Sequence, residues 1–167
     1  VLVAVQGAAT PEVTCTAVLG AFDEQHPVCL VPANREVAGA CRGLHAAFSA
    51  LDAAAAVHTL PRPMRADDVL PERALLGDAA ARDELYTAVF SSLLGESPDD
   101  PTLSTISAFI DSGGSLDMTA RELNVHPNTV RYRLKRAAET TGWDATDPRE
   151  AFVLRTAIAV GRMRDAS

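Results

Sequence analysis

The sequence predicts an α+β chain in two parts: a partial α/β module over residues 1–95, then an all-α domain over residues 101–167. In the first part, short apolar runs alternate with amphipathic helical patterns, which is typical of an α/β unit. In the second part, only helical patterns follow. The stretch "GESPDDP" (95–101) separates them, and its Gly, Pro, Ser and acidic residues indicate a helix stop and a linker.

The composition of the 167-residue chain, 47% hydrophobic and 22% charged, is that of a globular protein with one or two domains. No apolar run reaches the ~18 residues of a membrane span, and the start has no signal-peptide pattern. The three cysteines lie far apart without a CxxC pair, which favours a reducing cytoplasm over disulfides or a zinc site. Because the chain opens on Val1, we expect a fragment of a longer protein.

The net charge of −7 is unevenly distributed. Residues 1–100 contain 14 acidic and 6 basic residues, a net charge of −8, whereas residues 101–167 contain 8 acidic and 9 basic residues, a net charge of +1. This asymmetry predicts two modules with different partners.

The first part opens with a predicted strand, helix and strand. The apolar runs "VLVAV" (1–5) and "PVCLVP" (27–32) predict buried strands. Between them, Thr10 is expected to cap a helix that runs to about Glu24. Asn34 is expected to cap the next helix. Two strands are few for a sheet, so we expect a truncated domain.

The helix after Asn34 carries one apolar stripe, because its apolar residues recur at intervals of four and three. The stripe comprises Val37, Cys41, Leu44, Phe48 and Leu51. Cys41 is therefore expected in the core rather than as a nucleophile. A later helix, capped by Asp78 and stopped by Gly95, is expected to run to about Leu94 with one apolar face. That face consists of Leu85, Val89 and Leu93.

Acidic residues of this part could be read as a metal or acid–base cluster. They are Asp67, Asp68, Asp78, Asp83 and Glu84. Their positions at predicted helix starts favour caps and solvated first turns instead. The histidines His26, His45 and His58 have no ligand spacing. We therefore expect no catalytic residue, no metal and no cofactor.

Four helices are predicted in the second part. The first contains Leu103, Ile106 and Ile110 and stops at "SGG" (112–114); the others span residues 116–123, residues 127 to about 141, and a segment opened by Asp147-Pro148-Arg149-Glu150. The last start resembles a capping box, with Asp at the cap, Pro at N1 and Glu at N3.

The second and third of these helices are predicted to form a helix-turn-helix unit. Ala120 is small where the two helices would cross, and Leu123 and Val125 bracket the turn. His126 falls at the N-cap of the third helix and Pro127 at its first position.

The third helix has one inward and one outward face. Val130, Leu134 and Ala137 recur at intervals of four and three and are expected inside. Cations that flank this stripe, Arg131 and Arg133, can neutralise phosphates, and outward residues can contact base edges. The candidate DNA-binding residues are His126, Asn128, Thr129, Arg131, Tyr132, Arg133, Lys135 and Arg136. A basic helix in an acidic chain is thus explained by a local positive face.

The stretch "ARELNVHPNTVRYRLKRAAETTG" (120–142) resembles the helix-turn-helix of PucR/CdaR-type bacterial transcription regulators. The family pattern is a small residue, Leu, Val-His-x-Asn-Thr, then Tyr-Arg-Leu and a closing Thr-Gly. The resemblance covers residues 103–160, which correspond to the C-terminal DNA-binding domain of that family. Pro127 stands where the family leads us to expect Arg or another polar residue, which removes one possible phosphate or base contact.

The first part is similar to a further segment of the same family. Residues 67–94 resemble the segment before the DNA-binding domain, and the preceding strands and helix resemble a remnant of the central α/β domain. That domain is similar to a degenerate nucleotide cyclase, but no GGDEF-like signature is present, so no cyclase activity is inferred. Family members carry a further sensory part. An effector would therefore act through a region not present here.

We therefore expect a sequence-specific, DNA-binding transcription regulator that is not an enzyme and binds its operator through the helix 127–141. Its partners would be double-stranded DNA and a second copy of itself, because a single module buries only ~600–1,000 Å² on DNA. Residues 1–95 would be a regulatory or dimerisation module, and the signal would be sensed elsewhere in the chain.

Two alternatives remain open. A nucleotide-processing α/β enzyme fragment with an accessory helical domain would require a Gly-rich phosphate loop or a paired-carboxylate metal site, and neither is evident. The four helices could instead form a protein-interaction or dimerisation module.

Overall fold

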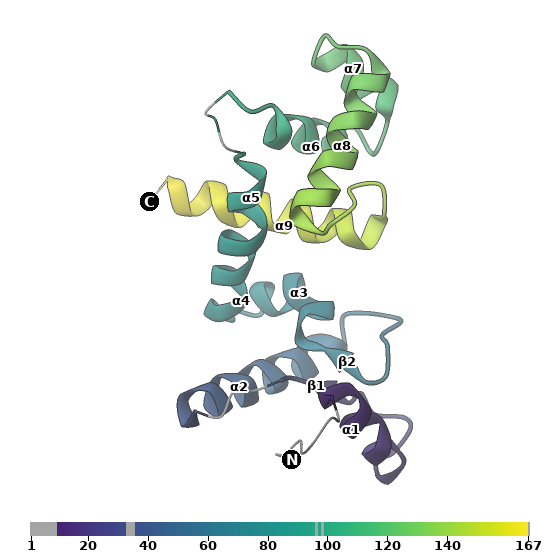
Figure 1. Ribbon diagram of the computed structural model, residues 1–167, viewed down its shortest axis with the longest axis vertical. Helices are drawn as coiled ribbons and strands as arrows, with labels where there is room; N and C mark the ends of the chain where they lie inside the picture. The colour runs from purple at the N-terminus through teal and green to yellow at the C-terminus, as the bar shows by residue number, and fades with distance from the viewer. Residues whose placement is uncertain (1–9, 33–35, 96, 98, 167) are drawn as a thin grey trace. The chain divides into compact units, whose positions relative to one another are not determined.

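The computed structural model describes residues 10–32, 36–95, 97 and 99–166, and divides into two compact units, residues 1–80 and 81–167. Most of the described residues are helical and they include one small sheet, in agreement with the predicted α+β class (Figure 1). The predicted strand at 1–5 and the predicted cap at Asn34 lie outside the described residues.

The first helix of unit 1 starts at the predicted side-chain cap. α1 (Pro11–Val18) follows Thr10, whose hydroxyl accepts a hydrogen bond from the backbone N–H of Val13 at 3.3 Å. This bond satisfies one of the N–H groups that have no partner within the helix. α1 ends before the predicted Glu24, and the 3₁₀ turn η1 (Leu19–Ala21) continues the chain.

The sheet of unit 1 consists of two short parallel strands. β1 (Cys29–Leu30) pairs with β2 (Met64–Arg65), with Cys29 opposite Met64 and Leu30 opposite Arg65. β1 lies inside the predicted strand at 27–32 and is shorter. β2 was not predicted, because its two residues stand in a Pro-rich stretch without an apolar run.

α2 (Val37–Ala54) packs mainly through small side chains, although Leu51 of the predicted stripe also packs against the core. The core of unit 1 comprises Ala50, Ala53, Ala54, Met64, Ala66 and Val69. By contrast, Val37 is 81% exposed, Phe48 is 65% exposed, and Cys41 is exposed. The prediction that Cys41 lies in the core is therefore wrong. Alanine leaves room for the helix backbone to approach β1, so the alanine face is the one that packs.

A buried ion pair closes unit 1 after the 3₁₀ turn η2 (Ala66–Val69) and α3 (Leu70–Leu75). Arg73 donates from Nε and Nη2 to one carboxylate oxygen of Asp78, at 3.1 and 2.9 Å, and both side chains are almost fully buried. The other Asp78 oxygen accepts a hydrogen bond from the backbone N–H of Ala80 at 3.0 Å. Asp78 therefore caps the next helix, as the sequence predicted.

That helix continues without interruption from Ala79 to Leu93. It consists of α4 (Ala79–Glu84), a π-helical segment η3 (Leu85–Phe90) and α5 (Ser91–Leu93). The predicted apolar face of Leu85, Val89 and Leu93 is buried. Gly95 follows with a φ of 70°, the left-handed conformation that glycine adopts most readily after a helix end.

Four helices complete unit 2, and their positions agree with the prediction. They are α6 (Thr102–Asp111), α7 (Leu116–Glu122), α8 (Pro127–Thr141) and α9 (Pro148–Asp165). α8 follows α7 through a tight turn, and α9 runs across the C-terminal end of α8 (Figure 1). Asp147 caps α9 by accepting from the N–H groups of Arg149 and Glu150 at 2.8 and 2.9 Å.

The segment η3 packs against α9 inside unit 2. The ring of Phe90 lies so close to Gly161 that a Cβ atom there would overlap it. At the end of α9, the Arg164 guanidinium lies 4.3 Å from the Tyr86 ring centroid and donates to Asp83 at 2.8 Å. The compact units divide between Ala80 and Ala81, in the first turn of the helix 79–93. The linker that the sequence indicated at 95–101 lies inside unit 2 and stays a prediction as a domain boundary.

Candidate nucleic-acid interface

α7 and α8 are joined by a four-residue turn with a defined backbone conformation. Asn124 has a φ of 52°, and asparagine is one of the few residues with a side chain that tolerate this region. The N–H of Val125 donates to the carbonyl of Ala120 at 2.9 Å, which closes the turn against α7. Ala120 is 4% exposed, so the small side chain lies at the helix crossing as the sequence predicted.

His126 caps α8 through its imidazole ring. The Nδ1 atom accepts a hydrogen bond from the backbone N–H of Asn128 at 3.1 Å. Because Nδ1 accepts, the ring proton of this neutral tautomer is on Nε2, where it can donate to a ligand. Pro127 occupies the first helical position, where the missing N–H has no cost.

The inward face of α8 is the predicted one. Val130, Leu134 and Ala137 are 0%, 4% and 1% exposed. Burial of these three side chains fixes the rotation of α8 about its axis. The opposite face must then point to solvent.

The outward face carries most of the predicted DNA-binding residues. His126, Asn128, Arg131, Tyr132, Lys135 and Arg136 are exposed, and Thr129 is half-buried. Arg131 Nη1 donates to the amide Oδ1 of Asn128 at 2.6 Å, so two of these side chains form a pair. Lys135 Nζ lies 3.8 Å from Glu139, with both side chains largely exposed. Such an exposed pair contributes little to stability and leaves the lysine able to contact a phosphate.

Arg133, which was predicted to bind DNA, does not lie fully on the exposed outward face of α8. It is half-buried, and its Nη1 donates to the hydroxyl of Thr105 on α6 at 3.3 Å. Hydrogen bonds from Thr102, with smaller effects of the nearby Arg136 and Arg133 guanidinium groups, lower the pKa of Asp100 below its ordinary value. Arg133 therefore also joins α8 to α6.

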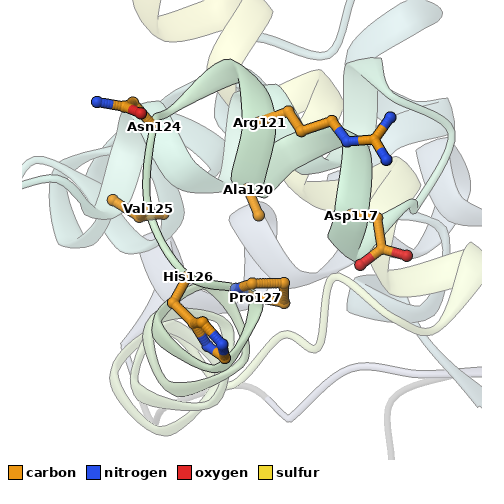
Figure 2. A pocket seen from close by; sticks show the side chains of 7 residues that line it. All are labelled: Asp117, Ala120, Arg121, Asn124, Val125, His126 and Pro127. Carbon is orange, nitrogen blue, oxygen red and sulfur yellow. The ribbon is translucent and has the colours of Figure 1, made fainter.

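A notch of about 550 Å³ opens between α7 and the start of α8. It is lined by Asp117, Ala120, Arg121, Asn124, Val125, His126 and Pro127. Figure 2 shows Asp117 and Arg121 projecting from α7, and His126 projecting from the start of α8. Arg121 is not among the predicted DNA-binding residues, because the predicted basic face lies on the third helix alone.

Two acidic residues of the first part, Asp68 and Asp78, cap helix starts as the sequence favoured, whereas Asp83 forms an ion pair. Asp68 accepts from the N–H of Arg65 at 2.7 Å, while Asp78 and Asp83 pair with arginines. Among the described residues, no group of three or more His, Cys, Asp or Glu side chains could hold a metal ion. Within the same residues, no helix has the length and apolar character needed to cross a membrane.

The residues of α6 to α9 match a known domain family. The family model of the PucR C-terminal helix-turn-helix domain matches residues 102–160. This chain carries the PucR C-terminal helix-turn-helix domain. The match begins at the first residue of α6 and ends within α9. The PucR domain is thus the α6–α9 part of unit 2, while the helix 79–93 precedes it.

Curated relatives extend the comparison to more of the chain. An uncharacterized protein of Mycobacterium tuberculosis is 44% identical over 145 residues, which cover 87% of this chain and 34% of that protein. The purine catabolism regulatory protein of Bacillus subtilis is 32% identical over 81 residues, which cover 48% of this chain and 15% of that protein. The chain therefore spans about a third of the length of the mycobacterial relative.

A solved structure matches nearly the whole chain. The crystal structure of the regulator of polyketide synthase expression from Bifidobacterium adolescentis superposes with a TM-score of 0.91 at 64% sequence identity. The match covers 96% of this chain and 63% of that one. The Bifidobacterium adolescentis protein and the Bacillus subtilis relative are both named as regulators.

Proposed function

We propose that this chain is the DNA-binding part of a transcription regulator that binds a specific operator through α8. The observation that carries the proposal is the outward face of α8. It presents polar side chains in its N-terminal half, Asn128 and Tyr132, beside cations that can contact phosphates. In helix-turn-helix proteins, the N-terminal residues of the second helix contact base edges in the major groove.

Electrostatics supports this use of α8. The segment 131–136 contains four cations, although the whole chain has a net charge of −7. Phosphate neutralisation depends on the local charge of the contacting face, since charges beyond ~10 Å are screened at 0.1 M salt. A DNA-binding role is therefore compatible with the acidic character of the first part. As a DNA-binding protein, the regulator would act in the bacterial cytoplasm.

We further propose that the regulator binds DNA as a homodimer. A single module of this size buries only ~600–1,000 Å² on DNA, which limits its affinity and specificity. Two copies would contact half-sites about one helical turn, ~34 Å, apart or a multiple of that distance. Unit 1 or a region beyond this chain would contribute the dimer contact and receive the controlling signal, such as a small-molecule effector.

Selection from a random duplex pool tests the proposal. The chain is expected to enrich one sequence motif from the pool and to retard that duplex, or DNA upstream of its own gene, more strongly than random DNA. Light scattering of the full-length complex is expected to give two protein copies per duplex. Enrichment of no motif would contradict operator binding, and a single protein copy per duplex would contradict the dimer.

A further inference from the structure

The helix before the recognition helix carries a cation that is not engaged elsewhere. Arg121 is exposed on α7 and borders the notch (Figure 2). Within the described part of the chain, its guanidinium forms no ion pair or hydrogen bond. Several other arginines of unit 2 have such contacts, among them Arg133 with Thr105, Arg155 with Asp111, and Arg164 with Asp83. Arg121 is thus free to bind a ligand.

The position of Arg121 matches the place where a helix-turn-helix unit contacts the DNA backbone. When the second helix of the unit enters the major groove, the first helix crosses the sugar-phosphate backbone. Arg121 lies on the last turn of that first helix, close to the turn that leads to His126. A guanidinium at this place can bind a phosphate with two parallel hydrogen bonds.

We propose that Arg121 is a backbone anchor, which binds a DNA phosphate at the notch between α7 and α8 and so fixes the register of α8 in the groove. The inference rests on the proposed DNA binding and adds a contact from outside α8. His126, which lines the same notch from the start of α8, has a further donor in its Nε2–H.

The negative charge of Asp117 is expected to weaken phosphate binding at this site. Its carboxylate lies one turn before Arg121 on α7 and lines the same notch. A phosphate bound at Arg121 would be repelled by this carboxylate. Removal of the Asp117 charge should therefore strengthen DNA binding. Glu122 lies about 100° further around α7 than Arg121, so it points away from the bound phosphate. Removal of its charge should therefore have a smaller effect.

Binding of the full chain to a random-sequence duplex of about 30 base pairs tests the anchor, since such binding depends on phosphates alone. Arg121→Ala is expected to reduce the magnitude of the slope of log affinity against log salt by ~0.9. If the variant and the wild type bind equally at 1 M salt, the variant should then bind about eightfold more weakly at 0.1 M salt. Arg121→Lys should keep the slope. Arg42→Ala, on an exposed face of α2, should bind as the wild type does.

Two substitutions on α7, each of which removes one negative charge, provide the matched control. Asp117→Asn is expected to bind the same duplex more tightly than Glu122→Gln, although both changes remove one negative charge. Melting temperatures should be equal for all these exposed variants. An Arg121→Ala variant with wild-type affinity and slope would overturn the anchor and leave the proposed function intact. Failure of the wild type to bind any duplex would overturn both.

Discussion

Arg131 Nη1 donates a hydrogen bond to Asn128 Oδ1 at 2.6 Å on the exposed face of α8, one turn from the His126 cap. The bond holds the guanidinium on the outward face of the helix. It also leaves the amide Nδ2 of Asn128 available to donate to an acceptor on a base edge. Arg133, two residues later, is held instead by Thr105 on α6.

The two arginines should therefore respond differently to mutation. Arg131→Ala is expected to weaken binding to all DNA sequences and to lower the salt slope by about one, with no loss of stability. Arg133→Ala is expected to lower the free energy of unfolding by ~0.5–1.5 kcal/mol, because the buried Thr105 hydroxyl loses a partner. Urea unfolding and a salt series separate the two effects. Equal stability losses in both variants would contradict the assignment.

Val130→Asp is expected to unfold the PucR domain rather than only to abolish DNA binding. Val130 is fully buried, and an unpaired buried carboxylate costs several kcal/mol, on the order of the ~5 kcal/mol stability of a small domain. Tyr132→Asp is the matched control, since Tyr132 is 66% exposed and should tolerate the charge. Circular dichroism during heating measures both. An unchanged melting temperature for Val130→Asp would mean that α8 is rotated from the orientation described.

After proteolytic cleavage within residues 95–101, the two fragments should remain associated. Gly95, Ser97 and Asp99 are exposed, so proteases should cut this segment, as the sequence indicated. The N-terminal fragment should stay bound, because Phe90 packs on Gly161 and Arg164 contacts Asp83. The nicked fragments should co-elute in size exclusion and separate only in denaturant.

Gly161→Val provides the control for this contact. A valine side chain would overlap the Phe90 ring, and such overpacking typically costs 1–3 kcal/mol. The nicked Gly161→Val chain should therefore dissociate at a lower urea concentration than the nicked wild type. Immediate separation of the wild-type fragments without denaturant would support a unit boundary at 95–101 instead.

The alkylation rate of each cysteine should depend on the exposure of its side chain and on the pKa of its thiol. Burial raises the pKa of the Cys29 thiol from the ordinary 9.0 to about 11. At pH 8, Cys29 then has about a hundredfold less of the reactive thiolate than an ordinary thiol, a protection lost as the pH rises towards 11. Mass spectrometry at pH 8 should detect alkylation of the exposed Cys41 first. Equal rates at both sites would show that α2 does not present Cys41 to solvent.

The helices of the PucR domain could be predicted closely because several local signals agreed. His126 and Pro127 marked the start of α8, and the predicted span of 127 to about 141 agrees with the observed Pro127–Thr141. The buried face followed from the spacing of Val130 and Leu134. Caps, glycine stops and apolar periodicity depend on neighbouring residues, which a sequence shows directly.

Tertiary contacts decided the features that could not be predicted. The periodicity of α2 indicated a buried stripe at Val37 and Phe48, but the helix packs through its alanines, such as Ala50. Periodicity identifies faces without showing which face has a partner. The contact between Phe90 and Gly161 likewise joins segments far apart in sequence, and only the fold shows that the helix 79–93 belongs with α9.

The contribution of Asn128 to sequence preference tests the central claim most directly. Wild type and Asn128→Ala should be compared on the duplex selected from the random pool and on random DNA, across a salt series. Asn128→Ala is expected to relax the preference at one base pair by ~1–3 kcal/mol and to leave binding to random DNA nearly unchanged. If the substitution lowers both affinities by the same factor, Asn128 does not contact bases and α8 does not dock in the groove as described.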